Sequence, residues 1–405
     1  MTRHRASLGN IDSGRRSRTP SDRIDHHAIG TRNGVRASAG AAALCAIAAG
    51  PVAGGQLVLL GKPLGGLIGV PGAVVGYIVL TAAVLGLLVA ALWLWRLRSA
   101  AGTASACGVL AGFAVIVAGA VDSVVVFTIA VLVAGAATGP LLAVGRALAF
   151  DLGRGGLVRV HAAAMVGMAA AAWLAGRYYA DPGGGLIIAG ALTSVLGLAT
   201  GLLARRGVGA LPPVRRAAIG VGVRSALPGY LAAGIAIGGA TLPALHLLLF
   251  RWNEFGAAQC MWLSIAAAPA VVAIIVPRRR PDAVPVLLIL AAGGMVLVAT
   301  APGPATLIIG LALTLSAGTR AVTTLDEGVC LSLVRAERTA AAGVTAAVAA
   351  LSGVAALGVV DLLGRLIGAG SALTVSALCV LVVVWSAVRS GARQRMRTAV
   401  EGGVS

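Results

Sequence analysis

The stretch Leu311–Gly358, which reads LALTLSAGTRAVTTLDEGVCLSLVRAERTAAAGVTAAVAALSGVAALG, decides the fold. Arg320 lies well inside a long apolar segment, and Asp326 and Glu327 follow two turns later on much the same face. A short loop with two arginines and a second segment of small residues come next. Two apolar segments around a basic turn predict a pair of membrane helices, and ionisable residues inside such helices are candidates for function.

A weaker copy of this pattern lies upstream at 137–176, ATGPLLAVGRALAFDLGRGGLVRVHAAAMVGMAAAAWLAG. A shift of 179 residues lays Arg159 on Arg338, each at the start of the segment after a basic loop. A shift of about 190 residues lays Gln56 over His246, with a helix-distorting proline nearby in both copies. The upstream copy carries Arg146, Asp151, Arg154 and Arg159. We therefore interpret the chain as two related halves.

Composition predicts an all-α polytopic membrane protein. Apolar residues make up 59% of the 405 residues, charged residues only 11%, and the mean hydropathy is +0.96. Uncharged runs of about 20 residues recur along the chain, and each is long enough to cross a hydrocarbon core of about 30 Å. A transmembrane barrel would show short alternating segments instead.

The net charge of +19 does not indicate nucleic-acid binding, because the arginines lie in short loops between apolar segments. The five cysteines are isolated within apolar segments, which predicts small buried side chains and no metal site. No phosphate-binding loop, nucleophile motif or paired carboxylates are visible, so we expect neither an enzyme nor a cofactor.

Twelve membrane helices are predicted between a polar, arginine-rich tail at 1–36, which we expect to be disordered, and a second tail at 390–405. The expected spans are 37–60, 67–95, 100–121, 123–149, 157–179, 185–204, 225–250, 255–277, 283–301, 303–333, 340–367 and 369–388.

A basic linker at 205–224, with two adjacent prolines, divides these spans into six-helix bundles at 37–204 and 225–389. Arginines gather at both tails and at every even-numbered loop, which predicts that both termini are cytosolic. We expect the plasma membrane as the location. Glycine pairs four residues apart, which start at Gly50, Gly72 and Gly234, predict close helix packing.

With these repeats and basic loops, the chain resembles the major facilitator superfamily over about residues 37–390. The resemblance implies two pseudo-symmetric six-helix bundles around a central cavity, lined by the first, fourth, seventh and tenth helices, and alternating access by rocking of the halves. The loop after the second span keeps Arg96 and Arg98 of the signature but lacks its aspartate and leading glycine. The drug-antiporter motifs of helices four and five are not matched, so the resemblance is to the superfamily as a whole.

Arg320 is the first candidate residue for substrate binding or coupling. It could attract an anionic substrate group, pair with an acid or backbone carbonyl, or snorkel toward the nearby loop. Gln56 and His246 occupy equivalent positions on helices expected to line the cavity, where they could bind substrate, handle protons, or join helices by hydrogen bonds.

Four charged residues are predicted to form a gate or charge layer between the bundles: Arg146, Asp151, Asp326 and Glu327. The acids could instead carry a proton or balance loop arginines at the membrane surface, and Arg146 could snorkel. Asp361 and Arg365 have the spacing of a local ion pair, for which we expect a structural role.

From these features we predict a secondary active transporter that moves a small organic molecule by alternating access, with proton-coupled efflux as the leading mode. A facilitative or organic-anion permease, and a non-transporting scaffold for envelope enzymes, are the alternatives. The expected partners are the substrate, protons as coupling ion and the lipid bilayer.

Overall fold

The computed structural model describes residues 20–94, 99–207, 221–260, 262–263 and 283–402. Within these ranges every regular element is a helix, as the composition predicts. Nine segments in the described ranges are long and apolar enough to cross a membrane, and the helix Ala283–Ala299 is a shorter apolar one. The arrangement is consistent with twelve spans, since the eighth, 255–277, lies largely outside the described residues.

Eight helices form the N-terminal half. They are α1 (Pro20–Ala48), α2 (Pro51–Leu59), α3 (Gly61–Leu67), α4 (Gly72–Leu94), α5 (Ala100–Ala120), α6 (Val124–Leu152), α7 (Arg154–Arg177) and α8 (Pro182–Arg206). The described part of the C-terminal half comprises α9 (Val221–His246), the π-helix η1 (Leu247–Arg251), α11 (Ala283–Ala299), α12 (Pro304–Ser332), α13 (Arg335–Ile367) and α14 (Ala369–Gly402).

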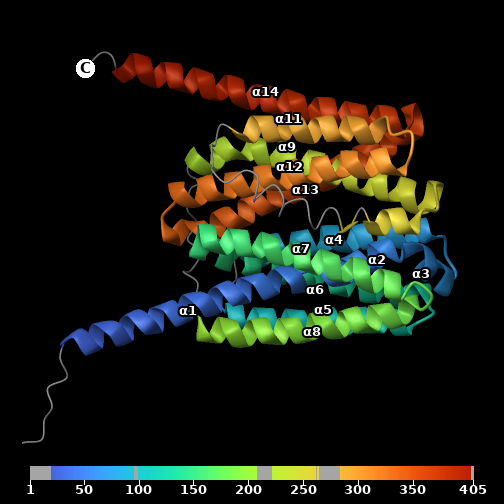
Figure 1. Ribbon diagram of the computed structural model, residues 1–405, viewed down its shortest axis with the longest axis horizontal. Coiled ribbons are helices and arrows are strands. Elements are labelled where there is room, and N and C mark those ends of the chain that lie inside the picture. Colours follow the sequence, from blue (N-terminus) through green and yellow to red (C-terminus); the bar gives the residue numbers. More distant parts are fainter. Residues whose placement is uncertain (1–19, 95–98, 208–220, 261, 264–282, 403–405) are drawn as a thin grey trace, which may run out of the picture.

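The two halves lie side by side as separate groups of roughly parallel helices (Figure 1). The labels α1 to α8 fall in the lower group and α9 to α14 in the upper group, and α13 packs on α4 and α6 across the boundary. At one end, which we call the termini end, α6 and α12 finish and α7 and α13 begin. At the other, the distal end, α7 and α13 finish. The long helices α1 and α14 extend beyond the groups at the termini end.

The first predicted span is broken into α1 and α2. Gly50 has φ of 116°, a left-handed conformation that glycine adopts at little cost, and Pro51 begins α2 at a position where its missing N–H is not needed. The equivalent region of the second half contains Pro243 inside α9 and then passes into η1. Both halves therefore interrupt their first span near a proline.

Close helix packing is present at one of the three predicted glycine pairs. A methyl group at Gly234 or Gly238 would collide with the backbone of α13 at Ala349 and Gly353. The prediction is wrong for the other two pairs, because Gly50 lies before the first residue of α2 as its N-cap, and a methyl group at Gly54 or Gly76 would meet open space. Spacing alone does not reveal which side of a helix faces a neighbour.

Helix α1 begins at Pro20, inside the tail that the sequence predicts to be disordered, and α14 continues to Gly402, past the expected end of the last span. Pro20 stands at the first helical position, which suits proline. Membrane-crossing segments end where the apolar run ends, but their helical hydrogen bonding can continue into water.

Candidate functional site

A cavity of about 650 Å³ lies between the two halves. Residues of α1, α4, α6 and α7 line it on one side, and residues of α9, α12 and α13 line it on the other. Leucine, valine, alanine and glycine make up almost all of this lining. Its position between two bundles, with both contributing walls, makes it the candidate binding site.

Arg146 is the only charged residue among the described residues that line this cavity, and Thr241 supplies the one hydroxyl. The guanidinium makes three hydrogen bonds to the other half. Its Nη2 donates to Oδ1 of Asp326 at 2.7 Å and to Oγ1 of Thr345 at 3.0 Å. Its Nε donates to the carbonyl of Ala342 at 3.0 Å. Arg146 therefore joins α6 to both α12 and α13.

The aromatic ring of Phe150 also packs against Arg146. Its guanidinium carbon lies 5.1 Å from the centre of the Phe150 ring, one turn further along α6, within reach of a cation–π interaction. The arginine side chain is 21% exposed, whereas its partner Asp326 is completely buried. Arg146 is also one of the residues that line the cavity, so the charge pair contacts the cavity through Arg146.

Asp326 is the centre of the polar cluster. Tyr230 of α9 donates its hydroxyl to Oδ1, the same oxygen that accepts from Arg146. Nε2 of His161 on α7 lies 3.9 Å from Oδ2, too far for a hydrogen bond, and Oδ2 accepts none from the described residues. A buried carboxylate oxygen that accepts no hydrogen bond can take up a proton or accept a hydrogen bond from a new donor.

The repeat explains why Arg146 and Asp326 meet. Each lies six residues before the end of its helix, Leu152 for α6 and Ser332 for α12. The two positions are 180 residues apart, within one residue of the shift that aligns the two halves. Equivalent depths in two facing copies place the opposite charges at one level, so pairing needs no special loop or kink.

The other two members of the predicted charge layer lie nearby in sequence. Glu327 is buried and Asp151 is partly exposed. Arg338, in the first turns of α13, has a buried Nε without a hydrogen-bond partner among the described residues. The side chains of Arg154 and Arg335, and the loop with Arg96 and Arg98, lie outside the described part. A gate role for the four predicted residues stays a prediction.

Arg320 and Gln56, the two residues predicted for substrate binding whose side chains the structure describes, are not brought together at the cavity. Arg320 is partly buried in α12 and does not line the cavity. Gln56 is fully buried inside the N-terminal half, where its Nε2 donates to the carbonyl of Ala171 at 2.6 Å and joins α2 to α7. His246 ends α9, and its side chain lies outside the described part. Roles for these three in binding or coupling stay predictions.

At the distal end the halves meet through more exposed groups. Nη2 of Arg365 lies 2.7 Å from Oδ2 of Asp361 and donates to the hydroxyl of Tyr77 at 3.2 Å. The pair with Asp361 has the local geometry that the spacing predicts, and the bond to Tyr77 crosses between the halves. A structural role for this ion pair stays a prediction.

Further contacts between the halves lie at the same end. The rings of Tyr179 and Phe255 are 4.2 Å apart between centres, and Gln259 donates to the carbonyl of Ala172 at 2.7 Å. Lys62 donates to the side chain of Asn253. The cavity thus lies between contacts at both ends.

Tyr230 and His161 are the site residues that sequence reasoning missed. The position of Tyr230 could have indicated a role for it. Two of the other tyrosines lie at a helix end and Tyr77 lies near one, whereas Tyr230 lies well inside α9. His161 stands in the quoted upstream copy, two residues after Arg159, and was overlooked among its charged neighbours. Thr345 carries no such signal, since threonines are scattered through the apolar helices.

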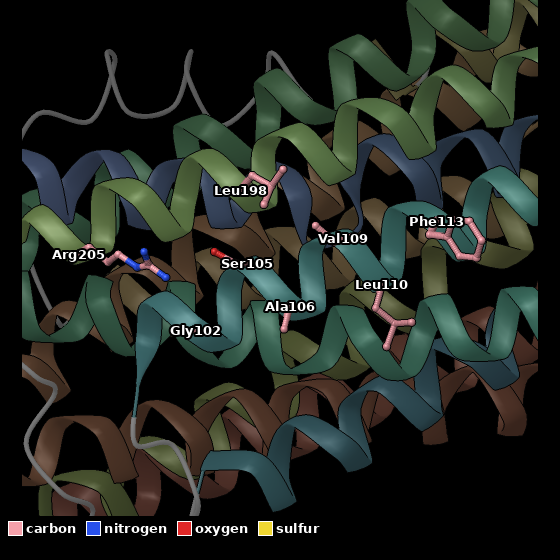
Figure 2. A pocket seen from close by; sticks show the side chains of 8 residues that line it. All are labelled: Gly102, Ser105, Ala106, Val109, Leu110, Phe113, Leu198 and Arg205. Carbon is pink, nitrogen blue, oxygen red and sulfur yellow. The ribbon is translucent and has the colours of Figure 1, made fainter.

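A second, shallower hollow lies on the outer side of the N-terminal half (Figure 2). Residues of α5 and α8 alone line it, among them Phe113 and Leu198, with the exposed Arg205 at one end. Because only one half contributes, this groove is not a site between the bundles. No group of histidine, cysteine, aspartate and glutamate suited to a metal ion occurs in the described ranges.

No family model and no curated protein matches the sequence. Solved structures do match. The human organic anion transporter MFSD10 (TETRAN) superposes with a TM-score of 0.66 at 16% identity, over 88% of this chain and 99% of that one.

A POT family transporter in complex with a thioalcohol-conjugated peptide gives a TM-score of 0.67 at 12% identity, over 88% and 96% of the two chains. The transporter FucP in its outward conformation gives 0.61 at 15%, over 86% and 97%. Identities this low establish the fold only. The chain has the fold of the major facilitator superfamily transporters.

Proposed function

We propose that this protein is a secondary active transporter that moves a small organic molecule through the cavity between its two halves by alternating access. The observation that carries the proposal is the cavity itself, which both halves line and which lies between contacts at both ends. Breaking the contacts at one end while keeping those at the other would open the cavity to one side of the membrane. The structures with the same fold are described as transporters.

Protons are the coupling ion that we propose, with Asp326 as their carrier. This carboxylate is completely buried, contacts both halves, and has an oxygen that accepts no hydrogen bond from the described residues. Protonation would weaken its attraction for Arg146, which is one of the contacts that hold the halves together at the termini end. Proton binding and opening at that end would then be coupled.

The plasma membrane location and the cytosolic termini also belong to this proposal. Their support is the distribution of arginine: Arg205, Arg206 and Arg224 flank one loop at the termini end, and both tails are rich in arginine. Export stays a prediction about direction.

Cys45 provides a test that needs no knowledge of the substrate. This buried cysteine lines the cavity, and the other four cysteines can be replaced by alanine to leave a single thiol. Membrane-impermeant thiol reagents are applied to right-side-out and to inside-out vesicles. Alternating access predicts that Cys45 is labelled from both sides, because the cavity opens to each side in turn.

Labelling from one side only would contradict alternating access and indicate a vestibule, and labelling from neither side would favour the non-transporting scaffold. Cys260, exposed near the distal end, is the matched control when it is kept as the single thiol. It should be labelled from one side only. Flux of aromatic probes into proteoliposomes, measured with and without a pH gradient, then separates proton coupling from facilitated diffusion.

A further inference from the structure

We propose that Arg146 is the anion-binding residue of the cavity, and that it receives the carboxylate of an organic anion with an apolar body in exchange for its bond to Asp326. This inference rests on the proposed transport function and adds the chemical class of the substrate. Recognition of this kind needs three things from the structure: a cation that reaches the cavity, a donor free to bind, and a place for Asp326 after the exchange.

Among the described residues that line the cavity, Arg146 carries the only charge, and Thr241 carries the only hydroxyl in lining that is otherwise apolar. An apolar cavity selects apolar molecular surface, and a guanidinium at its wall binds a carboxylate through paired hydrogen bonds. A neutral apolar molecule would leave the arginine without a new partner. The lining therefore fits a molecule with one acidic group and a hydrocarbon or aromatic remainder better than it fits a neutral or cationic one.

The guanidinium retains donor capacity. Its hydrogen bonds to the described residues use Nε and Nη2 only, and 21% of the side chain is exposed. A carboxylate that arrives from the cavity can bind Nη1 and then share or take Nη2, which is the donor to Asp326. Nε can keep its bond to the carbonyl of Ala342, so the arginine stays anchored to α13 during the exchange.

Asp326 has a partner after the exchange. Tyr230 already donates to its Oδ1, and Nε2 of His161 lies 3.9 Å from its Oδ2, close enough for a small movement to form a hydrogen bond. The exchange replaces one carboxylate by another on the same arginine, and Asp326 takes up the coupling proton proposed above, so neither the arginine nor the aspartate is left as a lone charge in the membrane. Asp326 thus occupies the place of the substrate's acidic group when the cavity holds no substrate.

The cavity volume limits the size of this substrate. About 650 Å³ lies within the range of small-molecule sites and is large enough for a bicyclic aromatic acid. The probe pair 2-naphthoate and 2-naphthamide suits a test, because the two molecules share their shape and ring system and differ in charge. Equilibrium dialysis with the full chain in detergent, corrected with protein-free micelles, gives both dissociation constants.

The wild type is expected to bind naphthoate at least about ten-fold more tightly than naphthamide, the effect of one charge-assisted pair. Arg146→Gln should abolish this preference and Arg146→Lys should keep part of it. Asp326→Asn should tighten naphthoate binding, because the competing carboxylate has lost its charge. Arg205→Gln, which alters an exposed arginine of the outer groove, is the control and should change neither constant.

Equal binding of the two probes by the wild type, or a preference that persists in folded Arg146→Gln, would overturn the inference. If Arg146→Gln does not give a monodisperse protein, Asp326→Asn becomes the test of the inference. Tighter naphthoate binding by this variant supports the exchange, and unchanged or weaker binding overturns it. Failure of the proposed transport function would give a different combination of results. Naphthoate binding would still depend on Arg146, but Cys45 would not be labelled from both sides. Two-sided labelling without a preference for the anion overturns this inference alone.

Discussion

The halves of this protein meet at two ends in different ways. At the termini end the contacts centre on a buried charge pair, Arg146 with Asp326. The aspartate is completely buried and accepts hydrogen bonds from two side chains through one oxygen. At the distal end Arg365 belongs to an ion pair and also donates a hydrogen bond to Tyr77 of the other half. The side chain of Arg365 is 66% exposed. The other contacts described above at this end are one neutral hydrogen bond from Gln259, one hydrogen bond from Lys62 and one ring pair.

From this difference we expect burial, more than the number of contacts, to set how much each contact contributes to holding its end closed. Exposed ion pairs contribute little because water screens them, whereas loss of one partner of a buried pair leaves a charge with nothing to solvate it. We therefore expect the distal end to open more easily than the termini end when no ligand is bound. Binding of an acid or a proton at Asp326 and Arg146 would reverse that preference.

The largest effect is expected from Arg146→Ala. It leaves Asp326 buried without its cation, which should lower the free energy of unfolding by about 3–5 kcal/mol. Denaturant unfolding in detergent, followed by tryptophan fluorescence, measures this. The double variant Arg146→Met with Asp326→Leu should recover most of the loss, because neither charge then remains. A single variant as stable as wild type would show that water reaches Asp326.

Tyr230→Phe should have the next largest effect. It removes the hydroxyl that donates to Asp326 and keeps the buried ring, at a cost of about 2 kcal/mol for a hydrogen bond to a charged group. Tyr179→Phe at the distal end is the matched control, because its described contact is made by the ring. The comparison between the ends fails if the two substitutions lower the free energy of unfolding equally.

The sequence predicts the architecture well because each membrane helix is recognisable as a long uncharged run. Such a run can be identified without knowing which distant residues contact it. The sequence also predicts that Arg146 and Asp326 belong to one layer, since equivalent positions of a repeat lie at equivalent depths. The same reasoning placed Gln56 and Arg320 at the cavity, and the structure puts neither in its lining.

The position of these two side chains outside the lining has a common physical cause, and their roles in binding or coupling stay predictions. Depth in the membrane can be counted along a helix, but the direction that a side chain faces depends on the rotation of that helix. In Ala- and Gly-rich helices nearly every face is apolar, so no hydrophobic stripe reveals the rotation. Gln56 turned inward to bond the carbonyl of Ala171, and Tyr230, which was not singled out, turned toward Asp326.

Gln259→Ala probes the distal end directly. It removes a neutral hydrogen bond between the halves, to the carbonyl of Ala172, and should cost about 1 kcal/mol. If this bond helps to close the distal end, Cys45 should be labelled about five-fold faster from that side. Ser386→Ala, which removes a hydroxyl bonded within its own exposed helix, serves as the control. No change in labelling would mean that other contacts close this end.

The smallest effect is expected from Arg365→Gln. Both members of its ion pair are at least half exposed, and the guanidinium competes with water for Asp361 and for the Tyr77 hydroxyl. Screening should make the pair nearly neutral for stability, so the unfolding midpoint should move less than in Gln259→Ala, with little dependence on salt. A loss as large as that of Arg146→Ala would mean that lipid or neighbouring helices cover this pair. The two ends would then be closed by equally strong charge pairs, and the expected preference for opening at the distal end would disappear.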